Sequence, residues 1–281
     1  MKVLILGSNG MLGQSLCDVF ASSELTCWDK EDIDITQEQE VQEKIFKLRP
    51  DIVINAAAYT NVDGAEEEKE AAFVINETGV KNIAQAAKDL DATLVHYSTD
   101  YVFSGTKSDG YAENDPPGPS VNAYGDSKLA GERALKEVGV KFFLIRTAWL
   151  YGAGGKNFVD TMLTLAQSNQ ELKVVDDQHG SPTYTKDLAK ATKQLLVEDY
   201  EPGIYHITNN GVVTWHGFAK EIFKITDQDI EVKPVTSEEF VRPAKRPEWS
   251  VLKNEIGPEV RGWQAALADY LSTKTNEHDN K

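Results

Sequence analysis

The first half of the chain alternates short apolar runs with longer segments of helical character. Consecutive apolar positions are typical of parallel strands buried on both faces. They predict strands over Lys2–Gly7, Leu25–Asp29, Asp51–Ala56, Thr93–Thr99 and Lys141–Trp149. The amphipathic segments between them predict helices over Leu12–Ala21, Gln37–Lys47, Ala71–Leu90 and Tyr124–Glu137. This alternation predicts the α/β class, with a Rossmann-like doubly wound parallel sheet.

The second half of the chain has a less regular pattern. It predicts helices over Lys156–Ser168, Tyr184–Leu196, Val213–Phe223 and Trp263–Thr273, and strands over Leu172–Val175, Ile204–Ile207 and Ile230–Pro234. The polar tail Thr273–Lys281 is expected to fray. We predict a first domain over residues 1–150. Residues 151–281 should form mainly a smaller C-terminal α/β substrate lobe, with some segments returning to the first domain.

The charge of the chain limits its partners. Its 281 residues include 29 Lys and Arg against 45 Asp and Glu, a net charge of −16. This balance argues against nucleic acid and anionic membranes, because both bind basic surfaces. The sequence has no apolar run of about 18 residues and no signal-peptide pattern, so we expect a cytoplasmic protein with no membrane span. In that reducing compartment Cys17 and Cys27 are expected to be small buried side chains.

A glycine-rich loop follows the first predicted strand. Gly7, Gly10 and Gly13 have the spacing G-x-x-G-x-x-G, which differs from the strict G-x-G-x-x-G fingerprint. Glycines let the backbone turn tightly and approach a pyrophosphate at the N-terminus of the following helix. Residues 1–150 are therefore predicted to bind a dinucleotide through Gly7, Asn9, Gly10, Met11, Leu12 and Gly13. The alternative is a plain tight turn.

The end of the second strand bears on the choice of cofactor. Asp29 would bind the ribose hydroxyls and favour NAD, whereas Lys30 would accept the extra phosphate of NADP. Both cofactors stay open, with a slight preference for NADPH over NADH. Asp34 and Ile35 follow as an edge for the adenine. The small residues Ala56–Ala58 would let the cofactor lie over the sheet.

Tyr124 and Lys128 are four positions apart, so they share one face of a helix. A nearby ammonium lowers the pKa of a phenol, which would make Tyr124 a usable general acid. Thr99 ends the fourth predicted strand, where its hydroxyl would hydrogen-bond a substrate carbonyl. The three residues predict a catalytic site. The alternative is a strand-end threonine and a surface helix pair.

Several longer sequence motifs indicate a resemblance to a known family. They are Gly7–Gly13, Arg49–Asp63, His96–Phe103, Asn122–Lys128, Arg146–Gly152, Asp177–Thr183, Arg246–Pro247 and Ser250–Leu252. With them the chain resembles the extended short-chain dehydrogenase/reductase superfamily, and more closely its dTDP-4-dehydrorhamnose reductase family. Ser98–Phe103 and Gly180–Thr183 are the most specific strings, and the resemblance runs nearly end to end.

The resemblance implies NAD(P)H-dependent reduction of the C4 ketone of dTDP-4-dehydro-L-rhamnose to dTDP-L-rhamnose, a step of polysaccharide biosynthesis. It implies that Tyr124 donates a proton to the forming alkoxide, that Lys128 holds the nicotinamide ribose and tunes Tyr124, and that Thr99 hydrogen-bonds the carbonyl. It also implies cofactor contacts from Ala56, Ala57, Ala58, Tyr59 and Thr60, and substrate contacts from Val62, Val102, Phe103, Trp149, Asn157 and Arg246.

A basic cluster independently suggests an anionic substrate. Arg242, Lys245 and Arg246 occur without an acid between them in a strongly acidic chain, and arginine engages phosphate in bidentate fashion. Some relatives form metal-bridged dimers through glutamates, but the matching positions here carry Ser15 and Lys186. We therefore expect no metal, and a monomer or weak homodimer.

Two other functions stay open at this point. One is a different nucleotide-sugar ketoreductase, epimerase or dehydratase of the same superfamily. The other is a non-catalytic NADP-binding regulatory subunit, which needs the cofactor site but not Thr99, Tyr124 and Lys128 together.

Overall fold

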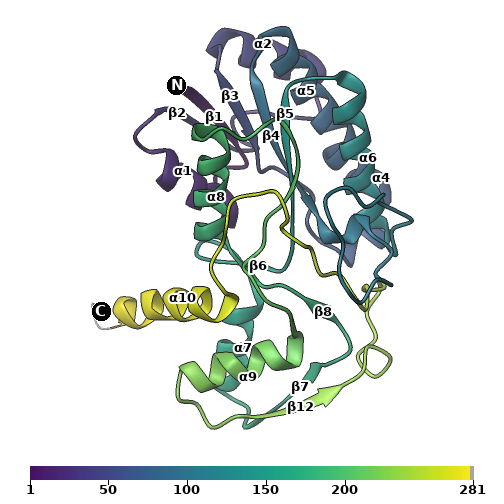
Figure 1. Ribbon diagram of the computed structural model, residues 1–281, viewed down its shortest axis with the longest axis vertical. Helices are drawn as coiled ribbons and strands as arrows, with labels where there is room; N and C mark the ends of the chain where they lie inside the picture. Colours follow the sequence, from purple (N-terminus) through teal and green to yellow (C-terminus); the bar gives the residue numbers. More distant parts are fainter. Residues whose placement is uncertain (279–281) are drawn as a thin grey trace.

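The computed structural model describes residues 1–278, and its largest element is a six-stranded parallel sheet (Figure 1). The strand order is β10-β5-β4-β3-β1-β2. The bounds are β1 (Lys2–Leu6), β2 (Glu24–Trp28), β3 (Ile52–Asn55), β4 (Thr93–Thr99), β5 (Phe142–Thr147) and β10 (Gly203–His206). Every pairing in this sheet is parallel, which confirms the predicted doubly wound α/β class.

Helices cover both faces of the sheet, and each face has its own apolar core. On one face Val3 and Ile5 pack with α1 (Met11–Phe20) and α8 (Thr185–Val197). On the other, Leu4 and Leu6 pack with α2 (Glu38–Leu48), α5 (Val80–Asp89) and α6 (Ala123–Val138). Successive side chains of a strand point to opposite faces. Both faces of β1 therefore need apolar residues, which explains its unbroken apolar run.

The predicted helix Ala71–Leu90 contains a change of helical type. The chain forms α3 (Gly64–Glu67) and α4 (Lys69–Phe73), then a π-helical segment η1 (Val74–Gly79), and then α5. Helix α6 packs closely here, because a Cβ on Gly131 would lie 2.0 Å from the Asn76 carbonyl oxygen. Single π turns are frequent at functional sites. Here the π segment holds the buried Asn76 against α6.

A smaller lobe occupies the lower part of Figure 1. It contains the helices α7 (Phe158–Ala166), α9 (Trp215–Ile225) and α10 (Trp263–His278), which share one apolar core. Its strand pairs are parallel β7 (Glu171–Val175) with β12 (Glu231–Val235), parallel β6 (Leu150–Tyr151) with β9 (Thr183–Tyr184), and antiparallel β8 (His179–Gly180) with β11 (Val213–Thr214).

Segments from the second half lie in the layers of the first. Helix α8 packs on α1, and β10 extends the large sheet beside β5. The segment between β12 and α10 runs back along the sheet layer (Figure 1), where Leu252 forms a bridge with Tyr111. Tyr111 follows a short 3-10 turn, η2 (Asp100–Val102), in the long loop after β4. A domain boundary at residue 150 stays a prediction.

Several predicted bounds were wrong for local reasons. Helix α9 begins at Trp215 instead of Val213, because Val213 and Thr214 pair with β8 and the Thr214 hydroxyl caps the helix. Helix α10 continues past its predicted end at Thr273 to His278, while residues 279–281 lie outside the described part; fraying of the tail stays a prediction.

The cysteines are less buried than expected. Cys27 is exposed and Cys17 is half-buried. Burial, with Cys27 nearby, raises the pKa of the Cys17 thiol to about 12, so this thiol stays protonated at neutral pH. Within residues 1–278, no helix has the length and apolar character needed to cross a membrane.

Candidate active site

The carboxyl ends of the strands border a cleft of about 1480 Å³. It includes the ends of β1 and β3, where the winding of the sheet reverses; open α/β sheets bind ligands at this point. The structure brings most of the predicted site residues to this cleft. They are Gly7, Asn9, Gly10, Met11, Leu12, Gly13, Asp29, Lys30, Asp34, Ile35, Ala56, Ala57, Ala58, Thr60, Val62, Thr99, Tyr124, Lys128 and Trp149.

The glycine loop is packed too closely for side chains at two positions. Gly7 has a φ of +76°, and a Cβ on it would lie 2.6 Å from the Ala57 nitrogen. A Cβ on Gly13 would lie 2.1 Å from the Gly7 carbonyl oxygen. Glycine is required at both positions. The loop therefore packs directly against the end of β3 and against the first turn of α1.

Asp29 follows β2 and connects the end of that strand to the glycine loop. Its carboxylate accepts hydrogen bonds from the backbone N–H groups of Asn9 and Lys30, both at 2.8 Å. Asp34 accepts from Thr36, and these bonds lower the pKa of the Asp34 carboxyl. The Thr36 hydroxyl is therefore not the cap of the next helix, and Gln37 is the N-cap of α2. The Lys30 side chain is 84% exposed, so its ammonium is accessible at the cleft.

Asn55 is a site residue that the sequence reasoning missed. It is buried at the end of β3, where its side-chain oxygen accepts from the Ala57 N–H at 3.1 Å. Its amide nitrogen lies 3.1 Å from Nδ1 of His96, whose pKa burial holds well below its usual value. A polar residue that ends an otherwise apolar strand was the available signal. Asn55 thereby shapes the turn that carries Ala56–Ala58.

Tyr124 and Lys128 lie on α6 and reach the cleft, as the spacing predicts. The buried Lys128 ammonium donates a 2.7 Å hydrogen bond to the Tyr97 carbonyl oxygen at the end of β4. Burial lowers the pKa of Lys128 to about 8, against the opposing charge of Glu132. Lys128 is thus held in place by β4.

The expected lowering of the Tyr124 pKa was wrong for the protein alone. Burial and the charge of Asp100 raise the pKa of Tyr124 above its ordinary value, and a hydrogen bond with Thr99 opposes this only in part. The phenol therefore keeps its proton at neutral pH. A protonated phenol is the form that a general acid requires.

Asp100 is a second residue that the sequence reasoning left without a role. It is buried at the cleft and accepts a 2.8 Å hydrogen bond from the Thr99 hydroxyl. Burial raises its pKa to about 6, although hydrogen bonds with Ser250 and Thr99 oppose the shift. The string Ser98–Phe103 contained the signal, since a charged residue follows the strand-end threonine directly. Asp100 orients the Thr99 hydroxyl.

Three side chains fix the first turn of α6. The Asn122 side chain accepts from the Gly125 N–H at 2.8 Å as the N-cap, and the Glu66 carboxylate accepts from the Ala123 N–H at 2.8 Å. Asn76, in the π segment, donates to the Ser127 hydroxyl at 2.9 Å. Donors at a helix N-terminus need such partners. These contacts set the direction of Tyr124.

Trp149 forms a wall of the cleft in an uncommon backbone conformation. It has a φ of 48°. Its indole stacks on Trp215 with ring centroids 3.5 Å apart and an interplanar angle of 8°. A Cβ on Gly180 would lie 2.5 Å from this indole, so the ring also covers β8. The lobe thus holds a flat aromatic surface at the cleft.

Three residues predicted to contact substrate lie elsewhere. Val102 and Phe103 are 0% and 1% exposed, in a core with Tyr111, Leu129 and Leu252. They face inward because η2 turns the chain directly after β4. Asn157 is the N-cap of α7, accepting from the Asp160 N–H at 3.0 Å and donating to the Gly152 carbonyl oxygen at 3.0 Å. These side chains do not line the cleft.

Tyr59 and Arg246 are also occupied by other contacts. The Tyr59 hydroxyl donates to Glu68 at 2.7 Å, and its N–H donates to Asn76 at 2.9 Å. Arg246 pairs with Asp63, which also accepts from the Ala244 N–H at 3.2 Å. Arg242 lies 3.9 Å from the same carboxylate. The basic cluster therefore ties its loop to the segment after β3.

We expect Asp63→Asn to lower Tm at pH 7 by about 2–4 °C, the change that about 1 kcal/mol produces in a chain of this size. Arg246 holds the pKa of Asp63 below its usual range. A lowered folded-state pKa stabilises the fold above the unfolded value of 3.8, and this stability is lost as the pH falls through the folded value. Thermal melts should therefore show the difference shrinking from pH 5 towards pH 3. Asp109→Asn, at the exposed pair with Lys253, is the control, and equal melts of Asp63→Asn and wild type at pH 7 would contradict the prediction.

A glycine loop between β1 and α1, a strand-end threonine and a Tyr–Lys pair on one helix together define a dinucleotide-dependent reductase type of site on a Rossmann-like sheet. The comparisons with known proteins agree with this class. The family model described as "RmlD substrate binding domain" matches residues 1–276, and the chain belongs to this family. The resemblance found in the sequence is thereby confirmed.

Relatives match over nearly the whole chain. The spore coat polysaccharide biosynthesis protein SpsK of Bacillus subtilis is 41% identical over 99% of this chain and 99% of its own. A dTDP-4-dehydrorhamnose reductase structure from Clostridium acetobutylicum is 42% identical, with a TM-score of 0.94, and covers 98% of this chain and 100% of that one. The Bacillus anthracis dTDP-4-dehydrorhamnose reductase, solved in complex with NADP, is 41% identical, with a TM-score of 0.92 over 97% and 100%.

Proposed function

We propose that this protein is an NADPH-dependent oxidoreductase that reduces the C4 ketone of dTDP-4-dehydro-L-rhamnose to dTDP-L-rhamnose. One observation carries the proposal: Thr99, Tyr124 and Lys128 line the same cleft as the glycine loop. Relatives named dTDP-4-dehydrorhamnose reductase, about 40% identical over most of their length, support the choice of substrate.

The cleft fits a dinucleotide. Gly7 and Gly13 pack the loop against β3 and α1, while a Cβ on Gly10 would meet only the Gly7 carbonyl oxygen, at 3.2 Å. Backbone N–H groups at the start of α1 suit a pyrophosphate, and Ala56–Ala58 present a surface of small side chains. These residues would hold NADPH, which supplies the hydride when bound.

The residues of the chain then provide the proton and the orientation. Tyr124 donates its phenolic proton to the substrate oxygen that becomes the C4 hydroxyl. Its raised pKa keeps this proton in place until charge develops on that oxygen. The Thr99 hydroxyl, which donates its single proton to Asp100 here, would rotate to donate that proton to the same oxygen. Lys128 holds the nicotinamide ribose and supplies positive charge near the site, and Trp149 forms the wall beside the sugar.

The direct test mixes the protein with NADPH and enzymatically generated dTDP-4-dehydro-L-rhamnose and follows the loss of absorbance of the reduced nicotinamide. We expect oxidation that depends on the sugar nucleotide. Oxidation with a different 4-keto nucleotide sugar alone would favour another ketoreductase. Cofactor binding without oxidation of any substrate would favour a regulatory subunit.

We expect Lys30→Ala to lower kcat/KM for NADPH by about 10-fold and to leave kcat/KM for NADH within about 2-fold. The Asp29 carboxylate is bound by two backbone N–H groups, while the Lys30 ammonium is accessible for an additional phosphate. A contact to a charged group that contributes about 1.4 kcal/mol changes kcat/KM tenfold when it is lost. Lys47→Ala, an exposed lysine away from the cleft, is the control. Equal losses with both cofactors would contradict the role of Lys30.

The remaining expectations concern assembly and location. We infer a small-molecule nucleotide sugar as the partner, a monomer or weak homodimer, and a cytoplasmic location. The absence of a metal-bridged dimer stays a prediction. Ser15 uses its hydroxyl to donate to Thr185 at 2.9 Å.

A further inference from the structure

A buried ion pair lies beneath the candidate active site. Glu132, on α6, is 0% exposed and Arg146, on β5, is 1% exposed. They pair in bidentate fashion, with Arg146 Nε 2.9 Å from Oε1 and Nη2 2.7 Å from Oε2. Bidentate geometry is the strongest form of this contact. The pair therefore fixes α6 against β5.

The same carboxylate also binds the end of β4. The Ser98 hydroxyl donates to Glu132 Oε1 at 2.7 Å. One turn earlier on α6, Lys128 donates to the carbonyl oxygen of Tyr97 at 2.7 Å. Two neighbouring residues of β4 are thus held by two side chains that lie on one face of α6. These bonds set the register of the helix relative to Thr99.

Arg146 also contacts His206, which in turn binds the segment between β12 and α10. Its guanidinium lies 4.9 Å from the centre of the Phe103 ring, and Nη1 lies 3.3 Å from His206 Nε2. Burial and Arg146 lower the pKa of His206 to about 4, so the ring is neutral. Nε2 then accepts from Arg146, and Nδ1 donates to the carbonyl oxygens of Tyr111 and Lys253, both at 3.1 Å.

We propose that Glu132 is a positioning residue for this site. Its buried carboxylate, on α6, joins that helix to β4 and β5 and so keeps Lys128 in register with the end of β4, and its negative charge, one helical turn from Lys128, favours the ammonium. The inference rests on the proposed function, because it assumes that Lys128 acts in the reaction. Glu132 itself does not line the cleft and is not a catalytic residue.

Glu132 is the negatively charged group near Lys128 that favours the charged form of the lysine. His96, on β4, is buried with a pKa well below its usual value and is neutral. Tyr124, one turn earlier on α6, has a raised pKa and is neutral too. Asp100, directly after β4, raises the pKa of that phenol, and Arg146, on β5, is paired with Glu132. The pKa of Lys128 is lowered by burial, and Glu132 is the charge that opposes this shift.

The test compares pH profiles of kcat/KM for the holoenzyme and its variants. In Glu132→Gln, which keeps the shape of the side chain, the alkaline limb should move to lower pH by about one unit, because the opposite charge beside Lys128 is lost. A variant that leaves Arg146 unpaired in the core is prone to misfolding. The double variant Glu132→Gln with Arg146→Met removes both charges at similar volume. Because it also removes the repulsion of the Lys128 ammonium by Arg146, its alkaline limb should move in the same direction by a smaller amount.

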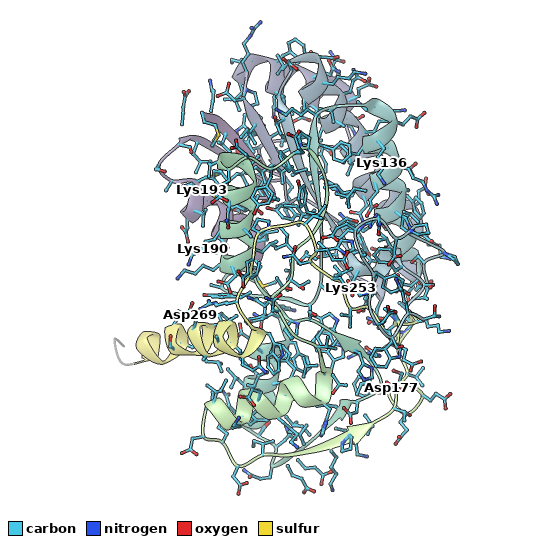
Figure 2. All side chains as sticks on the ribbon, viewed as in Figure 1. Lys136, Asp177, Lys190, Lys193, Lys253 and Asp269 are labelled. Atoms are coloured by element: carbon cyan, nitrogen blue, oxygen red, sulfur yellow. The ribbon has the colours of Figure 1, made fainter. Side chains whose placement is uncertain are left out.

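Lys136→Met is the matched control. Lys136 lies at the outer side of α6 (Figure 2), and its ammonium is 4.0 Å from Glu132 Oε2 but 40% exposed. This variant should keep the wild-type alkaline limb. An unchanged limb in both folded Glu132 variants would overturn the proposal, since a purely structural role would lower the rate without moving the profile.

A second measurement separates this inference from the proposed function. The 13C NMR titration of lysine-labelled protein, with the Lys128 signal assigned by its loss in Lys128→Met, follows the ammonium without turnover. We expect its midpoint to fall by about one unit in Glu132→Gln and by a smaller amount in the double variant. An unchanged midpoint would overturn the role of Glu132, whereas a wild-type protein that does not turn over would overturn only the proposed function.

Discussion

Replacing Tyr124 with phenylalanine is expected to lower kcat by about 10²-fold or more, the scale of general acid catalysis by a positioned side chain. The change removes one hydroxyl from a half-buried ring, so the fold and the cleft should keep their shape. The affinity for NADPH should stay within about 3-fold, because the glycine loop and Lys128 are intact. The loss should therefore lie in kcat instead of cofactor binding.

The measurements are steady-state turnover and a fluorescence titration with NADPH. Tyr205→Phe provides the matched control, because it removes a buried hydroxyl from β10, where the group donates to the Glu201 carbonyl oxygen. That variant should turn over at nearly the wild-type rate. Wild-type kcat in Tyr124→Phe would remove Tyr124 from the mechanism.

Replacing Gly10 with valine is expected to weaken NADPH binding by at least about 100-fold while leaving the fold intact. An added Cβ would meet only the Gly7 carbonyl oxygen, at 3.2 Å, so the loop can accept it with a small shift. The valine methyl groups would then occupy space in the cleft beside the start of α1. Loss of close backbone approach to a pyrophosphate removes charge-assisted hydrogen bonds that no other group replaces.

Isothermal titration with NADPH and a thermal melt together check this expectation. Gly203→Val is the control, because a Cβ there meets only the Glu201 carbonyl oxygen, at 3.9 Å, at the far edge strand β10. It should bind NADPH normally. A wild-type dissociation constant in Gly10→Val, with an unchanged melt, would contradict the assignment of this loop to the cofactor.

The pattern of apolar and polar residues predicted those helices and strands whose structure depends mainly on neighbouring residues in the sequence. Consecutive apolar residues located β1, β3 and β5, and a shorter apolar stretch located β4, because both faces of the sheet are covered. The spacing of Tyr124 and Lys128 predicted their shared helix face because that geometry belongs to the helix itself. The bounds of α9 and α10 were less predictable, since capping and strand pairing decide them.

Other features depend on contacts between distant parts of the chain, which no local pattern contains. The sequence predicted that Arg246 would be free to bind a diphosphate, but it pairs with the carboxylate of Asp63, which is 183 positions away. The Tyr124 pKa was expected to fall because of Lys128, yet burial by the folded chain raises it. The π segment escaped detection because its apolar spacing resembles that of an α-helix, and only the close packing of α6 distinguishes it.

The return of α8 and β10 to the large sheet has a consequence for how the chain can be synthesised and how it can evolve. Until Val197 has left the ribosome, α1 has no helix beside it, and until His206 has left it, β5 is an unprotected edge. The dinucleotide-binding layer is therefore completed after α7 and β6–β9 of the lobe have emerged and before α9, β12 and α10 have. Exchange of the second half of the chain at one junction would also replace α8 and β10, which belong to the large sheet and its helix layer. We therefore expect new specificity in this architecture to arise by substitution within the lobe.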